Sequence, residues 1–205
     1  AGAVPHAAGR RPSALFDAQG RLHLAYQTGE DTLQRSDIYY TLLDQGQWAS
    51  PQLISSGEHP AAGVRLAVDG QGRVHAVWRE KQPQQQLILY ASGLPRQWEY
   101  PRAISPELTA GAGPLLALGQ DRFLHSLWPQ ATALESAHRD LQQPDWQPPE
   151  LAAAESGQIG ELALAVDAGG RAHAVWVRRL DGEEGELCYG VRESVLPHRV
   201  FLPWL

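Results

Sequence analysis

The sequence predicts an all-β fold, a β-propeller of four-stranded antiparallel blades, with four blades encoded in 205 residues. The first observation is a motif that occurs four times and is best preserved as Leu-Ala-Val-Asp-Gly-Gln-Gly-Arg-Val-His-Ala-Val-Trp at positions 66–78. Its histidines are separated by 52, 50 and 48 residues and are His23, His75, His125 and His173. This period is typical of propellers and solenoids. The second observation is that each unit consists of short apolar or β-rich runs separated by turn residues, which predicts strands.

The first unit contains four such runs. We expect a first strand at 13–16, followed by the tight turn Asp17-Ala18-Gln19-Gly20, in which Asp accepts hydrogen bonds from backbone amides and Gly adopts a positive φ. Three more strands are expected at 22–27, 37–43 and 48–54, with a polar loop at 28–36 and a glycine turn at 44–46. The unit is therefore predicted to be an antiparallel meander.

The second unit repeats this order, with strands expected at 64–68, 74–79, 87–92 and 98–104. The spacing from Tyr40 to Trp48 recurs from Tyr90 to Trp98, which supports the alignment of the two units.

The third unit is the most altered copy. Gly119 replaces the turn Asp, and His138 replaces the strand Tyr while keeping the same spacing to Trp146. In the fourth unit we expect strands at 162–166, 172–177, 186–192 and 199–202.

These units predict a single domain over 1–205, with a connector or arm at 1–10 and blades at about 11–60, 61–110, 111–160 and 161–205. A solenoid would need shorter single-strand repeats, and βαβ units would need helical periodicity that the connectors lack. Two assemblies stay open: four blades close by themselves, or two chains complete an eight-bladed ring because the first and fourth blades would otherwise expose apolar faces.

Composition excludes several function classes. The formal net charge is -6 and the one lysine is Lys81, so we expect no nucleic-acid surface. No apolar run approaches the roughly 18 residues of a membrane span. The chain lacks Met and starts Ala1-Gly2-Ala3-Val4, as after signal-peptide cleavage or excision from a longer protein, and we expect a secreted or periplasmic location. A single Cys excludes an internal disulfide, and we interpret Cys188 as a small buried hydrophobe.

The repeated histidines could suggest a metal site, since imidazole is a common ligand. We instead expect each to lie on the second strand of its blade, too far from the others to share a metal ion, and to donate to a backbone carbonyl or a turn carboxylate. No metal or cofactor is predicted. The aromatic residues three positions later are expected to form the core between blades, and they are Tyr26, Trp78, Trp128 and Trp176. Trp48, Trp98 and Trp146 are expected to cover the second turns of their blades.

The loops between the second and third strands differ most between units. In a propeller they share one face with the connectors between blades, and that face is the usual binding surface. The charged residues that we expect on this face are Glu30, Asp31, Arg35, Arg79, Glu80, Arg178, Arg179 and Asp181.

The order of these elements resembles the repeats of sialidase-like, or BNR-like, propellers. Asp44-Gln45-Gly46-Gln47-Trp48, followed by Pro51, resembles a shortened form of that family's Asp-box, which is a structural turn. The resemblance implies a carboxylate-binding arginine triad, a Tyr nucleophile assisted by Glu, and an Asp acid/base. Arg10-Arg11-Pro12 matches only the Arg-x-Pro of the first arginine, and no second or third arginine can be assigned. True sialidases also have six blades.

We therefore expect a binding or interaction module without catalysis, with a protein or a glycan bound on the loop face. One alternative is a sialidase-like glycoside hydrolase or a fragment of one, which would have clustered arginines and a carboxylate of raised pKa in a pocket. Another is a structural subunit that completes a larger assembly.

Overall fold

A computed structural model describes residues 9–29, 36–108, 113–179 and 185–192. The regular secondary structure of these residues consists of β-strands, which form four antiparallel sheets. The predicted fold class is confirmed: the chain is an all-β protein whose sheets are β-propeller blades, numbered here 1 to 4. The chain divides into two compact units, residues 1–108 and 109–205, with two blades each.

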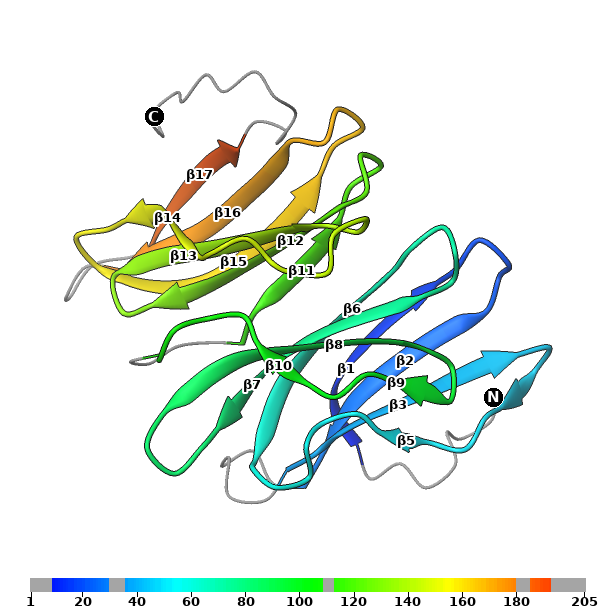
Figure 1. Cartoon of the computed structure of the whole chain (residues 1–205). Helices are drawn as coiled ribbons and strands as arrows, with labels where there is room; N and C mark the ends of the chain where they lie inside the picture. Colours follow the sequence, from blue (N-terminus) through cyan, green and yellow to red (C-terminus); the bar gives the residue numbers. More distant parts are fainter. Residues whose placement is uncertain (1–8, 30–35, 109–112, 180–184, 193–205) are drawn as a thin grey trace. The chain divides into compact units, whose positions relative to one another are not determined.

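The first unit contains blades 1 and 2 (Figure 1). Blade 1 is built from β1 (Gly9–Phe16), β2 (Leu22–Thr28), β3 (Ile38–Asp44), β4 (Gln47–Trp48) and β5 (Gln52–Leu53). Blade 2 is built from β6 (Ala61–Val68), β7 (Val74–Lys81), β8 (Gln86–Leu94), β9 (Gln97–Trp98) and β10 (Arg102–Ala103). In each blade the first three strands pair in sequence order, and the two short strands both pair with the third.

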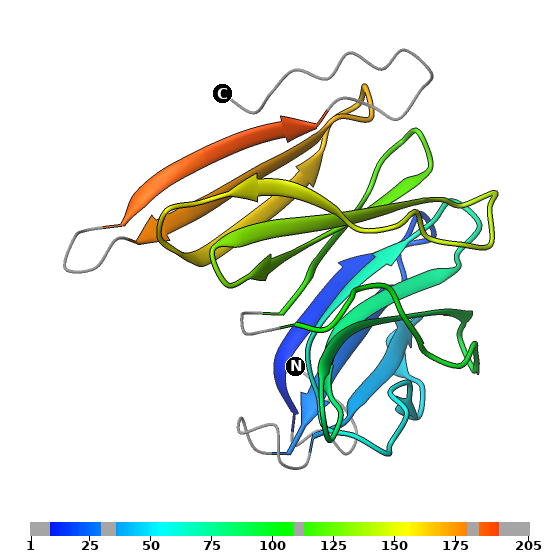
Figure 2. The ribbon, with the colours of Figure 1, turned by 60° about the vertical axis from the view of Figure 1, so that its left-hand side comes forward.

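The second unit contains blades 3 and 4. Blade 3 is built from β11 (Leu115–Leu118), β12 (Phe123–Gln130), β13 (Ala133–Asp140) and β14 (Glu150–Ala154). Blade 4 has three described strands, β15 (Gln158–Val166), β16 (Ala172–Arg179) and β17 (Glu186–Arg192). β17, orange-red in Figure 2, pairs with β16 along one side. The strand expected at 199–202 lies outside the described residues.

Several strand boundaries differ from expectation. β1 begins at Gly9 and β6 at Ala61, whereas these strands were expected to begin at 13 and 64. The segments expected to be connectors before them are therefore partly strand. The expected fourth strands at 48–54 and 98–104 are each split into two pieces. Pro51 and Pro101 lie between the pieces, and because proline lacks an N–H group it cannot donate to a strand ladder.

Each blade has two ends, which we name by their connections. The turn end carries the tight turn between the first and second strands, at 17–21 in blade 1, and the loop end carries the connection from the second to the third strand. Each sheet also has two faces, because side chains alternate along a strand. The His face carries the repeated histidine, and the Trp face carries the aromatic residue three positions later.

Neighbouring blades within a unit pack His face against Trp face. In the first unit Trp78 of blade 2 shares a buried cluster with Ile38 and Tyr40 of blade 1. In the second unit Trp176 of blade 4 shares one with Leu127 and Leu134 of blade 3. The half-buried Cys188 packs against this second cluster. Trp78 and Trp176 thus lie between the two blades of their units, where their large apolar area stabilises the fold.

Candidate functional site

The loop ends carry the residues that the sequence places on a binding face. The structure describes four of them, Arg79 and Glu80 at the end of β7 and Arg178 and Arg179 at the end of β16. Glu30, Asp31, Arg35 and Asp181 lie outside the described residues. The first pair belongs to the first unit and the second pair to the second unit.

Arginines from two blades lie near one another at the loop end of the first unit. Arg10 and Arg11 are exposed on β1, and Arg11 has a positive φ of 48° beside a bulge in the strand. Arg79 is half-buried on β7. Burial lowers the pKa of Arg79, and the nearby charge of Arg11 lowers it further. This loop end therefore carries positive charge from both β1 and β7.

Glu80 is buried rather than exposed on the binding face, with 1% of its surface accessible. Its backbone pairs with Ala61 of β6, and its carboxylate accepts a hydrogen bond from Ser56 Oγ at 3.3 Å. Burial raises the pKa of Glu80, although contacts with Gln82, Trp78 and Ser56 oppose the rise. Glu80 is therefore not exposed at this loop end, where the sequence analysis expected it.

The loop end of blade 4 contains a fixed arginine. Glu155 accepts hydrogen bonds from Trp176 Nε1 at 2.8 Å and from Arg178 Nη1 at 3.2 Å. Glu186 also accepts hydrogen bonds from Arg178. Arg178 is thus neutralised by two carboxylates, whereas Arg179 is exposed and pairs with no carboxylate among the described residues.

The turn ends carry the repeated histidines. In blade 1 the His23 ring lies between two partners, Asp17 Oδ2 at 3.0 Å from Nε2 and the Tyr40 hydroxyl at 2.8 Å from Nδ1. Because a carboxylate only accepts, the neutral ring donates from Nε2 to Asp17, and the Tyr40 hydroxyl donates to Nδ1. Blades 2 and 4 repeat the contact through His75 with Asp69 and Tyr90, and through His173 with Asp167 and Tyr189.

The same aspartates also hold the turns. Asp17 Oδ1 accepts hydrogen bonds from the amides of Gln19 and Arg21, each at 2.9 Å, and Gly20 has a φ of 75°. One carboxylate therefore links the backbone of the turn to the histidine on the next strand. Both this arrangement and its recurrence in three blades favour a structural role at the turn ends.

Blade 3 lacks both partners of its histidine. Gly119 stands at the position of the turn Asp, and the carboxylate of Asp121 occupies the space where a side chain at Gly119 would begin. Asp121 Oδ1 accepts from the Phe123 amide at 3.2 Å, so it caps the turn in place of the missing Asp. Within the described residues, neither Asp121 Oδ2 nor His125 Nε2 has a hydrogen-bond partner.

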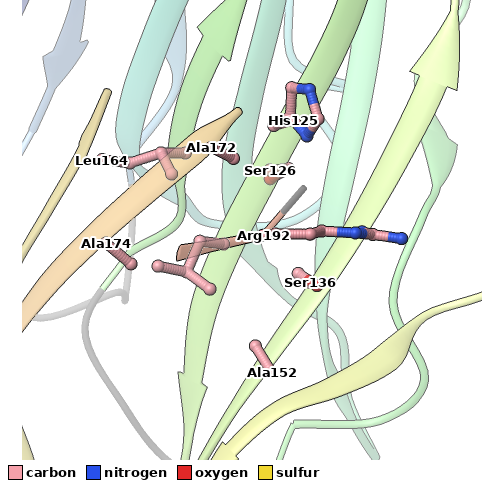
Figure 3. Close-up of a pocket in the computed structure, with 9 residues that line it drawn as sticks. His125, Ser126, Ser136, Ala152, Leu164, Ala172, Ala174 and Arg192 are labelled. Carbon is pink, nitrogen blue, oxygen red and sulfur yellow. The ribbon is translucent and has the colours of Figure 1, made fainter. Parts of the chain in front are cut away.

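A small cavity lies next to His125 (Figure 3). Its volume of about 20 Å³ gives room for one water-sized guest. Its lining includes His125, Ser126, Ser136, Leu164 and Arg192. Burial lowers the pKa of His125 to about 4, and the charges of Arg192 and His138 act in the same direction. The cavity is too small for a sugar ring, so we exclude it as a glycan site.

The charged groups around this cavity were not predicted. Arg192 of β17 and His138 of β13 both approach Glu150 of β14, and the His138 Nδ1 to Glu150 Oε1 distance is 3.6 Å. The substitutions at positions 119 and 138 were visible in the sequence as departures from the repeat. Arg192 and Glu150 carried no such signal, because they are 42 residues apart and meet only in the folded unit.

No group of three His, Cys, Asp or Glu side chains among the described residues is placed to hold a metal ion. The search for membrane spans, made over the same residues, finds no helix long and apolar enough to cross a bilayer.

Comparisons with solved structures give the same fold. The chain is similar to an alpha-L-arabinofuranosidase from Podospora anserina in complex with cellotriose (TM-score 0.58, 11% identity, 96% of this chain and 66% of that chain). It is also similar to a PL25 ulvan lyase bound to -[GlcA(1-4)Rha3S]- (TM-score 0.63, 11% identity, 88% of this chain and 55% of that chain). A third is the NanB sialidase from Streptococcus pneumoniae (TM-score 0.61, 9% identity, 91% of this chain and 50% of that chain).

The chain thus spans about half to two thirds of the length of these proteins. At such low identity the similarity establishes the propeller fold. No family model matches the chain, and neither does any curated protein.

Proposed function

We propose that the chain is a non-catalytic module that binds acidic glycans at the loop end of its first unit. The observation that carries the proposal is that Arg11 on β1 and Arg79 on β7 lie at the same loop end, because β1 packs beside β6 and Ala62 of β6 pairs with Arg79. Guanidinium groups match the geometry of a carboxylate and form strong charge-assisted hydrogen bonds with it. A uronate or sialate carboxylate bound there would accept hydrogen bonds from the guanidinium group of Arg11.

The structural neighbours support this ligand class. One is named as a sialidase, and another is a lyase bound to a saccharide that contains GlcA. We also propose that Arg10, the arginine of the Arg-x-Pro in Arg10-Arg11-Pro12, takes the place of the arginine that sialidase-like propellers use for a substrate carboxylate, and that Arg11 adds a second guanidinium beside it. The shortened Asp-box at 44–48 belongs to the same proposal and lies in the β3–β4 turn at the opposite end of the blade.

Binding is favoured over catalysis by the position of Glu80. A glycosidase acid must reach the glycosidic oxygen. Glu80 is the carboxyl group of raised pKa among the described residues of this loop end, yet 1% of its surface is accessible. Its hydrogen bond with Ser56 instead ties β7 to the segment that precedes β6.

The test is a calorimetric titration with sialyllactose, with a glucuronate-containing oligosaccharide and with neutral lactose. We expect binding of at least one acidic glycan, no binding of lactose, and weaker binding as salt is added. Arg11→Gln should lower the affinity at least about tenfold, a loss of roughly 1.4 kcal/mol.

Arg96→Gln is the matched control, because it removes the same charge from an exposed residue at the turn end of the same unit. Gly46 occupies the corresponding turn position of blade 1 with a φ of 79°. The preceding residue of that turn, Gln45, also has a positive φ, of 47°, so glutamine is compatible with this type of backbone. Equal losses in both variants would contradict a specific site, as would equal binding of lactose.

A further inference from the structure

The His face of blade 4 is exposed. Leu187, Tyr189 and Val191 alternate along β17 and are 76%, 55% and 37% exposed. They lie opposite Val177, Val175 and His173 of β16, so all six side chains share one face. Large contiguous apolar surfaces of this kind mark interaction sites.

The same positions are buried in the first unit. Tyr40 and Tyr90 make the histidine contact that Tyr189 makes in blade 4, yet they are 2% and 1% exposed. The residues of the repeat therefore form a His face that is suited to burial, and in blade 4 this face is exposed to solvent.

Blade 1 shows what covers such a face. The ring of Trp98, from blade 2, meets Tyr40 edge to face with 5.1 Å between ring centroids. Trp98 was expected to cover a turn of its own blade, and its ring packs on the neighbouring blade as well. The partner of a His–Tyr face is thus the Trp face of another propeller blade.

The chain has such a Trp face at its other end. Trp48 of blade 1 pairs with Leu43 as Trp98 pairs with Gly93, so the two tryptophans occupy equivalent positions. Leu43 and Phe16 both pair with Leu22, which places them with Trp48 on the face opposite His23. Phe16 is 68% exposed, so this face is not fully covered.

We propose that the occupant of the blade 4 face is blade 1 of a second copy of the chain. Trp48 of that copy would meet Tyr189 as Trp98 meets Tyr40. The contact joins two different surfaces, and such head-to-tail contacts form closed rings when the rotation closes. Two copies would then make two equivalent junctions. This proposal is independent of the glycan site, because dimerisation and glycan binding are measured separately.

The experiment is sedimentation equilibrium on the purified chain at several concentrations. The expected result is a mass of about 45 kDa, twice the 22.5 kDa of one chain. Leu187→Glu on blade 4 and Phe16→Glu on blade 1 should each give a monomer, since both residues are exposed and the substitutions leave the fold of the chain intact. Leu151→Glu, at a residue 62% exposed on β14, is the control and should stay a dimer.

Mixing the Leu187→Glu and Phe16→Glu variants tests whether the contact joins blade 4 of one copy to blade 1 of the other. One junction of the mixed dimer keeps two unchanged faces, so the mixture should regain dimers that neither variant forms alone. A wild-type monomer at all concentrations would overturn the proposal. A dimer that Leu187→Glu disrupts and Phe16→Glu does not would also overturn it, because the contact would then join blade 4 to blade 4.

Discussion

The hydroxyl of Tyr40 lies 2.8 Å from Nδ1 of His23, and both side chains are buried. Tyr189 and His173 make the same contact at the same distance, but on an exposed face of blade 4. The protein thus contains one hydrogen bond in two environments, which allows the effect of burial to be measured within a single chain.

Removing the hydroxyl should be costly only where the contact is buried. Tyr40→Phe leaves Nδ1 of His23 without a donor in a dry site, and we expect it to lower the free energy of unfolding by about 1–3 kcal/mol. Tyr189→Phe should change it by less than about 0.5 kcal/mol. Urea unfolding in the Leu187→Glu background, which keeps blade 4 uncovered, measures both. Equal losses would contradict the role assigned to burial.

The Asp121 carboxylate should make replacement of Gly170 by alanine destabilising. Gly20 and Gly170 both have positive φ, 75° and 81°, so an Ala at either position carries the same backbone strain. A Cβ at Gly20 meets nothing within 4 Å, whereas one at Gly170 collides with Asp121. We expect Gly170→Ala to destabilise the protein by at least about 1 kcal/mol more than Gly20→Ala. Adding Asp121→Ala to Gly170→Ala should remove this excess, and its persistence would exclude the collision as the cause.

Stability should fall in acid through Asp17. Burial alone would raise the pKa of Asp17, but hydrogen bonds from His23 and Arg21 outweigh it and hold this pKa well below its usual range. The stability that results is present above the unfolded-state pKa of about 4 and is lost as the pH falls below it. Asp17→Asn should therefore show a flatter loss of unfolding free energy below pH 4. An unchanged slope would contradict the coupling of Asp17 to His23.

His125 should change the unfolding free energy at a higher pH than Asp17 does. Burial lowers its pKa to about 4, so the unfolded chain takes up this proton first, at about pH 6.5. The unfolding free energy should be at its full value above pH 6.5 and fall by up to about 3 kcal/mol as the pH approaches 4. His125→Gln should flatten this part of the curve. An unchanged slope in that variant would show that His125 is not the group responsible.

The strands and turns could be predicted because their signals are local. A turn such as 17–21 needs only an Asp, a Gly and the strand that follows, and all of these lie within a few residues. The burial of Glu80 could not be predicted, because it depends on Ser56, which is 24 residues away. The approach of Arg11 to Arg79 also depends on how two blades pack. Arg79 and Glu80 were both expected on one binding face, but they are consecutive residues of β7, so their side chains point to opposite faces of the sheet. Packing then buries Glu80.

The central claim is that this propeller holds an acidic glycan without cleaving it. The most direct test is to incubate the chain with a radiolabelled acidic oligosaccharide that it binds, release the ligand and determine its mass. We predict that the oligosaccharide is recovered intact after many hours and that its retention on the protein depends on Arg11. Recovery of shortened or unsaturated fragments, at a rate proportional to the amount of protein, would contradict the account and identify the chain as a glycan-cleaving enzyme.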